Sequence, residues 1–286
     1  MPSRPTHAAV SQFISNIIPS KTNDVQLLYH VPRHPKYDSN HARVDQIVLS
    51  VTPTPGVYKL IGYEAAERAA QEPAEAAPSR PPRTICFLHR PFTLDRRQVR
   101  RGVLVSASHT SFDENLTVGW NTALANQLKM NVVESACVRG YKGDPDRKIG
   151  IVGPTSMERS LLETHIKQEF GTVEASYEGA SDDIHAVAIM NAFHAEEVHR
   201  VLEVARQHGW LSADEQAGQH LLYLTGQPRE SGLATAKEHG LSVVCVGHRA
   251  AEDWGIRYLA SRLRSAFPVV DIKEVYEEES PIKEKE

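Results

Sequence analysis

Three apolar segments of the sequence end in residues that can bind a metal ion. In two of them a histidine stands four residues before a carboxylate, and this spacing puts both side chains on one face of a helical turn. Imidazole and carboxylate groups together suit zinc, iron, manganese or nickel, and a carboxylate can bridge two ions. The segments are TICFL before His89, GVLVSAS before His109 and Asp113, and LSVVCVG before His248 and Glu252.

The elements that must position these residues are strands, and amphipathic helices alternate with them along the chain. Such alternation is typical of an α/β fold, in which ligands bind beyond the carboxyl ends of the strands. A single histidine–carboxylate pair is more often a surface pair or a helix cap, but three such segments at strand ends together favour a metal site. Thr155 and Glu158 have the spacing of a capping box. We expect strands at 46–52, 84–88, 102–107, 148–153, 185–190, 220–225, 241–246 and 269–275, helices at 8–18, 119–129, 160–170, 194–208 and 253–266, and a loop at 20–45.

Composition limits the classes of partner. The net charge of −4, without a long basic run, gives no reason to expect nucleic-acid binding, and no apolar stretch is long enough for a membrane span, so we expect neither partner. Cys86, Cys137 and Cys245 are far apart in apolar runs, which predicts buried thiols in a reducing compartment. We therefore expect a cytoplasmic protein. The alternative is a mitochondrial one, because the first 23 residues lack acids and contain Arg4 and Lys21.

Two segments have compositions that do not favour packing. Residues 72–83 are rich in alanine, proline and glutamate, and burial of so little apolar surface does not offset the entropy lost on ordering. We expect a flexible insertion there. Residues 277–286, EEESPIKEKE, form a charged tail that we expect to fray.

The same segments carry motifs of a known family. GHRAAEDWGIRYLASRL resembles the closing motif of the NGG-interacting factor three (Nif-three-like) family, also called GTP cyclohydrolase 1 type 2 homologs. SASHTSFDENLTVGWNTALANQL resembles its His-Thr-x-x-Asp segment, LYLTGQPRESGLATAKEHGLSVVCVGH its Thr-Gly-Glu strand end and following helix, and CFLHRPF stands where the family has His-His-Pro. The resemblance covers most of residues 8–275 in the right order.

This resemblance implies a fold and a set of metal ligands. The fold would be a three-layer α/β structure forming a single domain over 1–275, with interleaved lobes at about 8–135 and 147–275 and a metal cleft between them. Family members form ring-like homo-oligomers, so we expect a homo-oligomer here. The ligands would be His89, Asp113, His248 and Glu252. For His109 we favour a role in orienting Asp113 or capping a helix over a role as ligand.

Two positions depart from the family's dinuclear motif. Arg90 stands where the second histidine of His-His-Pro belongs, and Gln227 replaces the glutamate of Thr-Gly-Glu. A guanidinium cannot bind a metal ion and repels a nearby cation. We therefore expect at most one divalent ion, of zinc, iron or manganese, per chain. Arg90 either pairs with Asp113 or Glu252 and offers charge to a phosphate-containing ligand, or is an exposed arginine or part of a structural ion pair.

Two functions are compatible with these residues. The first is a metal-dependent hydrolase with a degraded dinuclear site, acting on an unknown small-molecule substrate, in which the metal activates water and Asp113 or Glu252 bridges or acts as base. The alternative is a non-catalytic oligomeric binding or regulatory scaffold protein, in keeping with the transcription-related interaction in the family's name. Metal content of protein purified without chelator separates the two.

Overall fold

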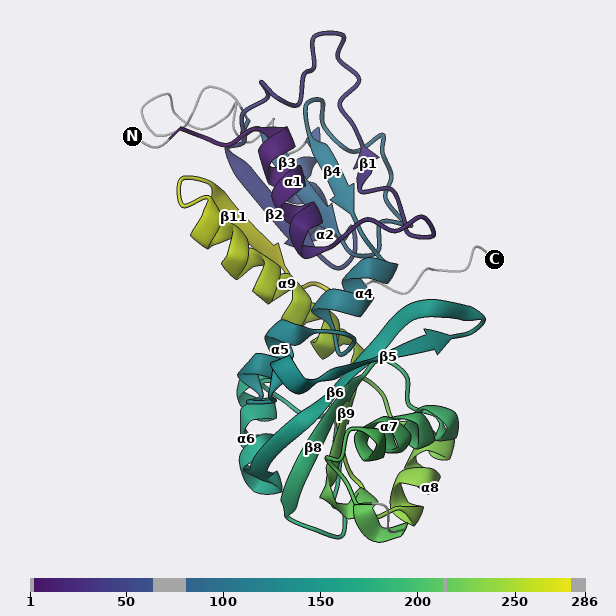
Figure 1. Cartoon of the computed structure of the whole chain (residues 1–286). Helices are drawn as coiled ribbons and strands as arrows, with labels where there is room; N and C mark the ends of the chain where they lie inside the picture. Colours follow the sequence, from purple (N-terminus) through teal and green to yellow (C-terminus); the bar gives the residue numbers. More distant parts are fainter. Residues whose placement is uncertain (1–2, 64–80, 213–214, 279–286) are drawn as a thin grey trace, which may run out of the picture. The chain divides into compact units, whose positions relative to one another are not determined.

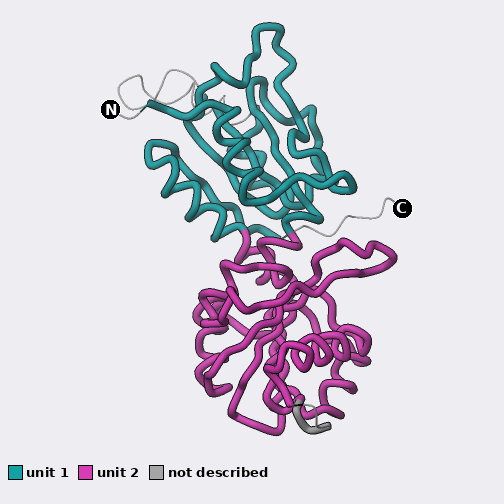
Figure 2. Tube along the Cα trace, viewed as in Figure 1, with its two compact units in different colours: residues 1–112, 256–286 teal, residues 113–255 magenta. Residues whose placement is uncertain are grey.

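The chain divides into two compact units, and the second is inserted into the first (Figure 2). Unit 1 comprises residues 1–112 and 256–286, and unit 2 comprises residues 113–255. The computed structural model describes residues 3–63, 81–212 and 215–278, without the side chains of 215–217.

These units differ from the predicted lobes at about 8–135 and 147–275. The difference arises because strand β11 (Asp271–Val275) pairs along its whole length with β2 (Gln46–Ser50) and thereby joins the sheet of unit 1. The proposed insertion at 72–83, except for its last three residues, lies outside the described residues, as does most of the tail at 277–286. Of those three, Arg83 is held by hydrogen bonds to Asp45.

Unit 1 is built around a five-stranded sheet with the order β1-β4-β3-β2-β11 (Figure 1). Strands β4, β3, β2 and β11 run parallel, and β1 pairs antiparallel with β4. Every residue of β2 and β3 is buried, as expected for parallel strands covered on both faces. The strands not yet delimited are β1 (Leu28–His30), β3 (Thr84–Leu88) and β4 (Leu104–Ala107).

Helices cover this sheet through their apolar positions. Val57 and Ile61 of one helix pack on the face formed by Val48, Cys86 and Val105. Phe13 of another contacts Phe267 edge-on, with ring centroids 5.3 Å apart. The helices of unit 1 are α1 (His7–Ile17), α2 (Pro55–Ile61), the first turn of α4 (Thr110–Leu116) and the later turns of α9 (His248–Ala266).

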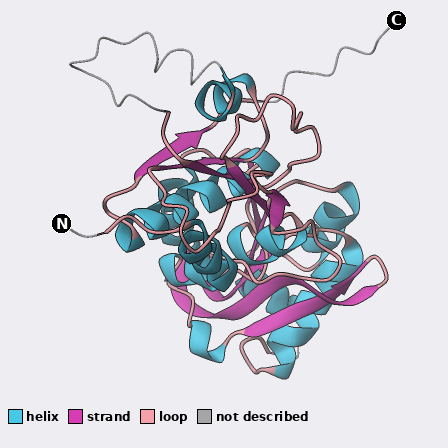
Figure 3. Cartoon of the chain, turned by 90° about the horizontal axis from the view of Figure 1, so that it is seen from above, coloured by secondary structure: helices cyan, strands magenta, loops and turns pink. Residues whose placement is uncertain are grey.

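Unit 2 contains a six-stranded mixed sheet with the order β5-β6-β8-β9-β10-β7. Figure 1 labels β5, β6, β8 and β9 of this sheet, and Figure 3 distinguishes the strands of the chain from its helices by colour. Its three central strands, β8, β9 and β10, are parallel, and the remaining pairings are antiparallel. Parallel neighbours need a crossover connection, and α7 and α8 provide these two crossovers. The strands are β5 (Ala136–Tyr141), β6 (Asp144–Glu158), β7 (Ala175–Tyr177), β8 (Asp183–Met190), β9 (Leu221–Thr225) and β10 (Ser242–Cys245).

One face of this sheet carries the main core of unit 2. Val198, Val201 and Leu202 of α7 pack with Ala236 of α8 on inward-facing strand residues such as Tyr223. Helix α6 packs against β6. The helices of unit 2 are the last turn of α4, α5 (Thr122–Gln127), η1 (Val132–Glu134), α6 (Arg159–Phe170), α7 (Ala195–Gln207), η2 (Glu215–His220), α8 (Glu230–Glu238) and the first turns of α9.

The predicted α/β class is confirmed, but three local predictions are wrong. The Thr155–Glu158 capping box does not form, because β6 continues through Glu158 and α6 begins without a side-chain cap. The expected loop at 20–45 contains β1. The predicted helix at 253–266 begins at His248, directly after Gly247 in a left-handed conformation (φ +93°).

The structure also bears on the expected buried thiols and on the expected absence of a membrane span. Cys86 and Cys245 are buried and Cys137 is half-buried, and all three are free thiols. Burial raises the pKa of Cys245 to about 12 and that of Cys86 further. Within the described ranges, no helix has both the length and the apolar character needed to cross a bilayer.

Tyr223→Phe is expected to lower the free energy of unfolding by about 1–2 kcal/mol, because a buried acceptor loses its donor. The fully buried Tyr223 hydroxyl donates to the carbonyl oxygen of Ala192 at 2.7 Å. Urea denaturation measures the change. Tyr177→Phe, at an exposed position, is the control and should shift stability by less than about 0.5 kcal/mol. Equal midpoints for the two variants would contradict the assignment.

Candidate metal centre

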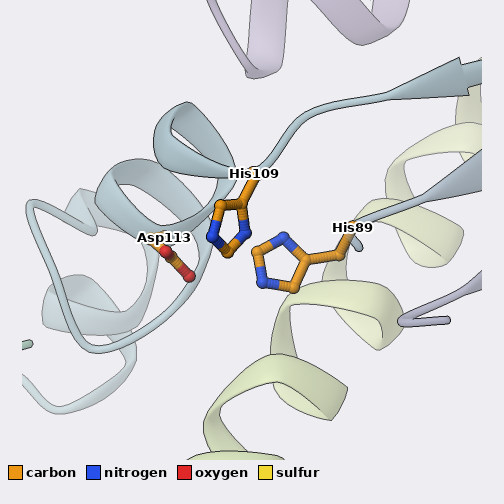
Figure 4. A group of neighbouring side chains, drawn as sticks. All are labelled: His89, His109 and Asp113. Atoms are coloured by element: carbon orange, nitrogen blue, oxygen red, sulfur yellow. The ribbon is translucent and has the colours of Figure 1, made fainter. Parts of the chain in front are cut away.

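His89 and His109 lie at the same edge of the sheet of unit 1. His89 directly follows β3, and His109 comes two residues after the neighbouring parallel strand β4. Because parallel neighbours end at the same edge of a sheet, the two rings meet, with centroids 4.9 Å apart (Figure 4). The sequence prediction that strand ends gather these side chains holds for this pair.

Asp113 joins the two histidines through helix α4. The helix begins at Thr110, so Asp113 lies one turn after His109. One ligand atom from each of His89, His109 and Asp113 lies within 4.8 Å of the others (Figure 4). The boundary between the units falls inside this helix, and the helix itself therefore sets the position of Asp113 relative to His109.

The hydrogen bond of His89 defines its tautomer. Its Nδ1 lies 3.1 Å from the carbonyl oxygen of Ser108, and a carbonyl only accepts, so Nδ1 carries the proton. In the neutral ring, Nε2 then carries the lone pair, as in a histidine prepared for a metal ion. The ring is fully buried and stacks on Phe112, with centroids 4.4 Å apart.

Asp24 fixes the start of α4 from a distant part of the chain. Its carboxylate accepts backbone N–H groups from His109, Thr110 and Ser111 at 2.9–3.0 Å, and it accepts the Ser108 hydroxyl at 2.9 Å. Partial burial raises the pKa of Asp24, but these hydrogen bonds together outweigh it and hold the pKa below its usual value. Asp24 therefore acts as the helix cap that positions His109 and Asp113.

A pocket of about 190 Å³ lies in unit 2, and three of the predicted ligands line it: Asp113, His248 and Glu252. His248 and Glu252 are four residues apart at the start of α9, and His248 Nε2 lies 3.2 Å from a Glu252 carboxylate oxygen. The Glu252 side chain is 2% exposed and that of His248 is 54% exposed. The predicted sharing of a helical face by this pair is confirmed.

Two arginines line the same pocket and were not foreseen. Arg147, in β6, approaches Asp113 to 4.0 Å between guanidinium nitrogen and carboxylate oxygen. Arg229 donates to the side-chain oxygen of Gln227 at 3.3 Å. Gln227 thus faces the pocket at the position where the family motif has an acid. The sequence around Arg147, DPDRK, offers no signal of this role.

The backbone at Asp113 is also held in place. Its carbonyl oxygen accepts the Thr117 hydroxyl and the Asn191 side-chain amide, each at 2.6 Å. The Thr117 hydroxyl also lies 3.0 Å from the side-chain oxygen of Asn191, so its single hydrogen is shared between the two acceptors. These bonds connect α4 to the residue that follows β8, so the lining of the pocket is fixed by polar contacts as well as by packing.

The predicted ligands therefore fall into two groups that share Asp113. One contains His89, and His109, which we did not favour as a ligand from the sequence, lies beside it; the other contains His248 and Glu252. Convergence of His89, Asp113, His248 and Glu252 on a single ion stays a prediction. The backbone N–H of Arg90 donates to the carbonyl oxygen of Val51 at 2.7 Å.

A further group of possible ligand atoms lies elsewhere in unit 2, formed by Asp183, His185 and His220. The two rings are stacked, with centroids 4.4 Å apart and planes at 5°, so an ion between them would lie outside both ring planes, in which the nitrogen lone pairs point. His185 and Asp183 are exposed and already bonded to each other at 2.9 Å. This group is the weaker candidate.

Solved structures share this fold. Reduced HcgD from Methanocaldococcus jannaschii is 17% identical with a TM-score of 0.59, over 96% of this chain and 99% of that one. The Staphylococcus aureus hypothetical protein SA1388 is 13% identical with a TM-score of 0.59, over 99% of this chain and all of that one. At such identities the likeness concerns the fold alone, and it confirms the predicted fold.

Sequence comparison identifies the family. A curated relative from Deinococcus radiodurans, named GTP cyclohydrolase 1 type 2 homolog, is 25% identical over 176 residues. The aligned part is 61% of this chain and only 60% of that relative. The family model described as Duf34/NIF3 (NGG1p interacting factor 3) matches residues 93–281, well over half of the chain. The resemblance seen in the motifs is therefore confirmed, and the chain belongs to the Duf34/NIF3 family.

Proposed function

We propose that this protein binds one divalent metal ion, with Asp113 as the central ligand, and uses it in hydrolysis. The observation that carries the proposal is the grouping of His89, His109 and Asp113, whose ligand atoms lie within 4.8 Å of one another. His248 and Glu252, which line a pocket with Asp113, are the further ligands that we propose.

The donor set fits zinc, iron or manganese. Imidazole nitrogen and carboxylate oxygen are ligands that these ions share, and His89 is buried in the tautomer that leaves its Nε2 lone pair for an ion. Asp113 is a half-buried carboxylate that lies 4.0 Å from Arg147. This positive neighbour offsets part of the carboxylate's charge, which favours one ion over two.

A bound ion of this type would polarise a phosphoryl or amide group and lower the pKa of a coordinated water. The chain's own residues would hold the ion and place charge around it. Glu252 is buried and lies 3.2 Å from the half-exposed His248, so one turn of α9 would offer both side chains to the ion. Arg147 and Arg229 in the same pocket suit a phosphate-containing substrate.

Metal analysis of protein purified without chelator is expected to give at most one equivalent of zinc, iron or manganese per chain. Arg90→His should raise the content toward two, because it removes a positive charge and adds a ligand at the position where the family motif has histidine. Inductively coupled plasma mass spectrometry measures both. Two equivalents in the unaltered protein, or no change in Arg90→His, would contradict this account.

The alternative function is a non-catalytic oligomeric binding protein. It is favoured by Gln227, which stands at the pocket where the family motif has an acid. Metal-loaded protein should hydrolyse a generic phosphodiester such as bis-p-nitrophenyl phosphate if the first proposal is right. Stoichiometric metal without turnover of any phosphoester or amide tested would favour the alternative.

A further inference from the structure

A groove of about 600 Å³ in unit 1 gathers positive charge. We call it the arginine groove, because Arg33, Arg96, Arg97, Arg100 and Arg101 all line it. The whole chain carries a net charge of −4, so this is a local concentration and not a general excess. Every residue that lines the groove belongs to unit 1.

Two of these arginines, Arg97 and Arg100, already have hydrogen-bond partners within unit 1. Arg97 forms a double hydrogen bond with Asp95 at 3.0 and 3.1 Å. Arg100 is 4% exposed and donates to the carbonyl oxygens of Leu60 and Pro82, and thereby fastens the groove wall to α2 and to the start of β3. Neither charge needs a ligand to explain it.

Arg33, Arg96 and Arg101 are different. All three are exposed, and within the part of the chain that the structure describes no carboxylate comes within 4.0 Å of any of them. Arg96 lies over the ring of Tyr29, 4.6 Å from its centroid, which holds the guanidinium in place. Among the described residues, the groove therefore presents three arginines without an ion-pair partner.

The pKa of His30 also shows the effect of the positive charges in the groove. Burial, and then the positive charges of Arg96 and Arg33, lower the pKa of this histidine. Both guanidinium groups therefore act on one point of the groove wall, although 62 residues separate them in the sequence. Holding like charges this close in a concave surface costs free energy that a bound anion would recover.

The remaining lining indicates the organic part of such an anion. Tyr63 is 48% exposed at the groove, and Pro32 and Val99 add apolar surface. The volume exceeds what a phosphate group needs and falls in the range of about 300–1,000 Å³ that holds organic ligands. Guanidinium groups bind phosphate through paired N–H donors. We propose that the arginine groove binds an organic polyphosphate of nucleotide size, with phosphates at Arg33, Arg96 and Arg101 and a planar group against Tyr63.

Isothermal titration of the full chain with ATP, in buffer containing EDTA so that no metal centre contributes, tests the proposal. Arg96→Ala is expected to weaken ATP binding about tenfold, because one charged donor group is lost. Arg262→Ala is the matched control, since Arg262 is also exposed over a tyrosine ring, at 5.8 Å, but lies outside the groove. It should leave the affinity unchanged. Added salt should weaken binding to the unaltered protein.

Further titrations, with other ligands and with a second variant, test which chemical groups the arginine groove binds. Inorganic tripolyphosphate should bind more weakly than ATP, and equal affinity would overturn the organic part of the proposal. Tighter binding of a single-stranded oligodeoxythymidylate, lost in Arg96→Ala, would make the groove a nucleic-acid surface and overturn it. ATP binding that is lost in Asp113→Asn but kept in Arg96→Ala would place the nucleotide at the proposed metal centre instead. Absence of ATP binding would end the proposal.

Discussion

Replacing Asp113 with asparagine is expected to remove nearly all bound metal, because the variant loses the carboxylate that both groups of proposed ligands share. Changing groups that only support a metal ligand costs about 10–100-fold in affinity, so loss of a charged ligand should cost at least about 100-fold. Metal titration of the chelator-treated variant against the unaltered protein measures the loss. Asparagine matches the shape of aspartate, so the thermal melting curve of the metal-free protein should change little.

Asp183→Asn provides the matched control for this experiment. Asp183 belongs to the exposed Asp183–His185–His220 group, and the same chemical change there removes one negative charge without touching the proposed centre. Its metal content should stay at the level of the unaltered protein. If Asp183→Asn loses the ion and Asp113→Asn keeps it, the metal site is the one on β8 and the assignment to Asp113 is wrong.

Asp24→Ala is expected to lower the free energy of unfolding by about 2–3 kcal/mol, because four donors lose a charged acceptor at once. Those donors are the hydroxyl of Ser108 and the first backbone N–H groups around α4. Since α4 carries Asp113, we also expect metal affinity to fall by about tenfold. Chemical denaturation and metal titration measure the two effects separately.

Asp38→Ala is the control for Asp24, from the same part of the chain. Asp38 is exposed and bonds only locally, to His41 at 2.7 Å and to the backbone of Asn40. Its removal should cost less than about 0.5 kcal/mol, the usual size of a surface effect. Similar losses in the two variants would mean that the α4 cap contributes little, and a stable Asp24→Ala with normal metal affinity would contradict the positioning role.

The strands that the sequence predicted well are those buried on both faces. TICFL became β3 without a change of boundary, because a parallel strand inside a sheet reads as a continuous apolar run. Strand β7 escaped prediction since it has three residues, none of them fully buried, and gives no periodic signal. Helix α6 begins within one residue of its predicted start, but the capping box expected before it does not form, because a bulged strand continues through Glu158.

In the candidate metal centre too, residues in local sequence patterns could be predicted, whereas residues that make long-range contacts could not. His89, Asp113, His248 and Glu252 could be proposed as ligands from the sequence, because strand ends, four-residue spacings and the family's motifs are local patterns. Asp24 was not, because it meets its partners at Ser108–Ser111 only in the folded chain, across 84 to 87 residues. No periodicity encodes such a contact.

The place of Arg147 in the pocket could not be predicted from the sequence for a related reason. It reaches Asp113 from a strand 34 positions further along the chain, and nothing in the surrounding sequence marks it. The net charge likewise gave no sign that arginines at 33 and 96–101 come together in one groove. Net charge is a sum over the chain and carries no information about placement.

The interrupted course of unit 1 has a consequence for synthesis on the ribosome. Residues 113–255 form a continuous stretch, so unit 2 can close its six-stranded sheet as soon as that stretch has emerged. Unit 1 must wait for residues 271–275, because β11 supplies the last strand beside β2. Until then β2 is a bare edge of five apolar or uncharged residues, QIVLS, open to pairing with another nascent chain. Unit 1 is thus synthesised first but completes its folding last. A chaperone that covers the exposed edge of β2 would therefore assist unit 1 more than unit 2.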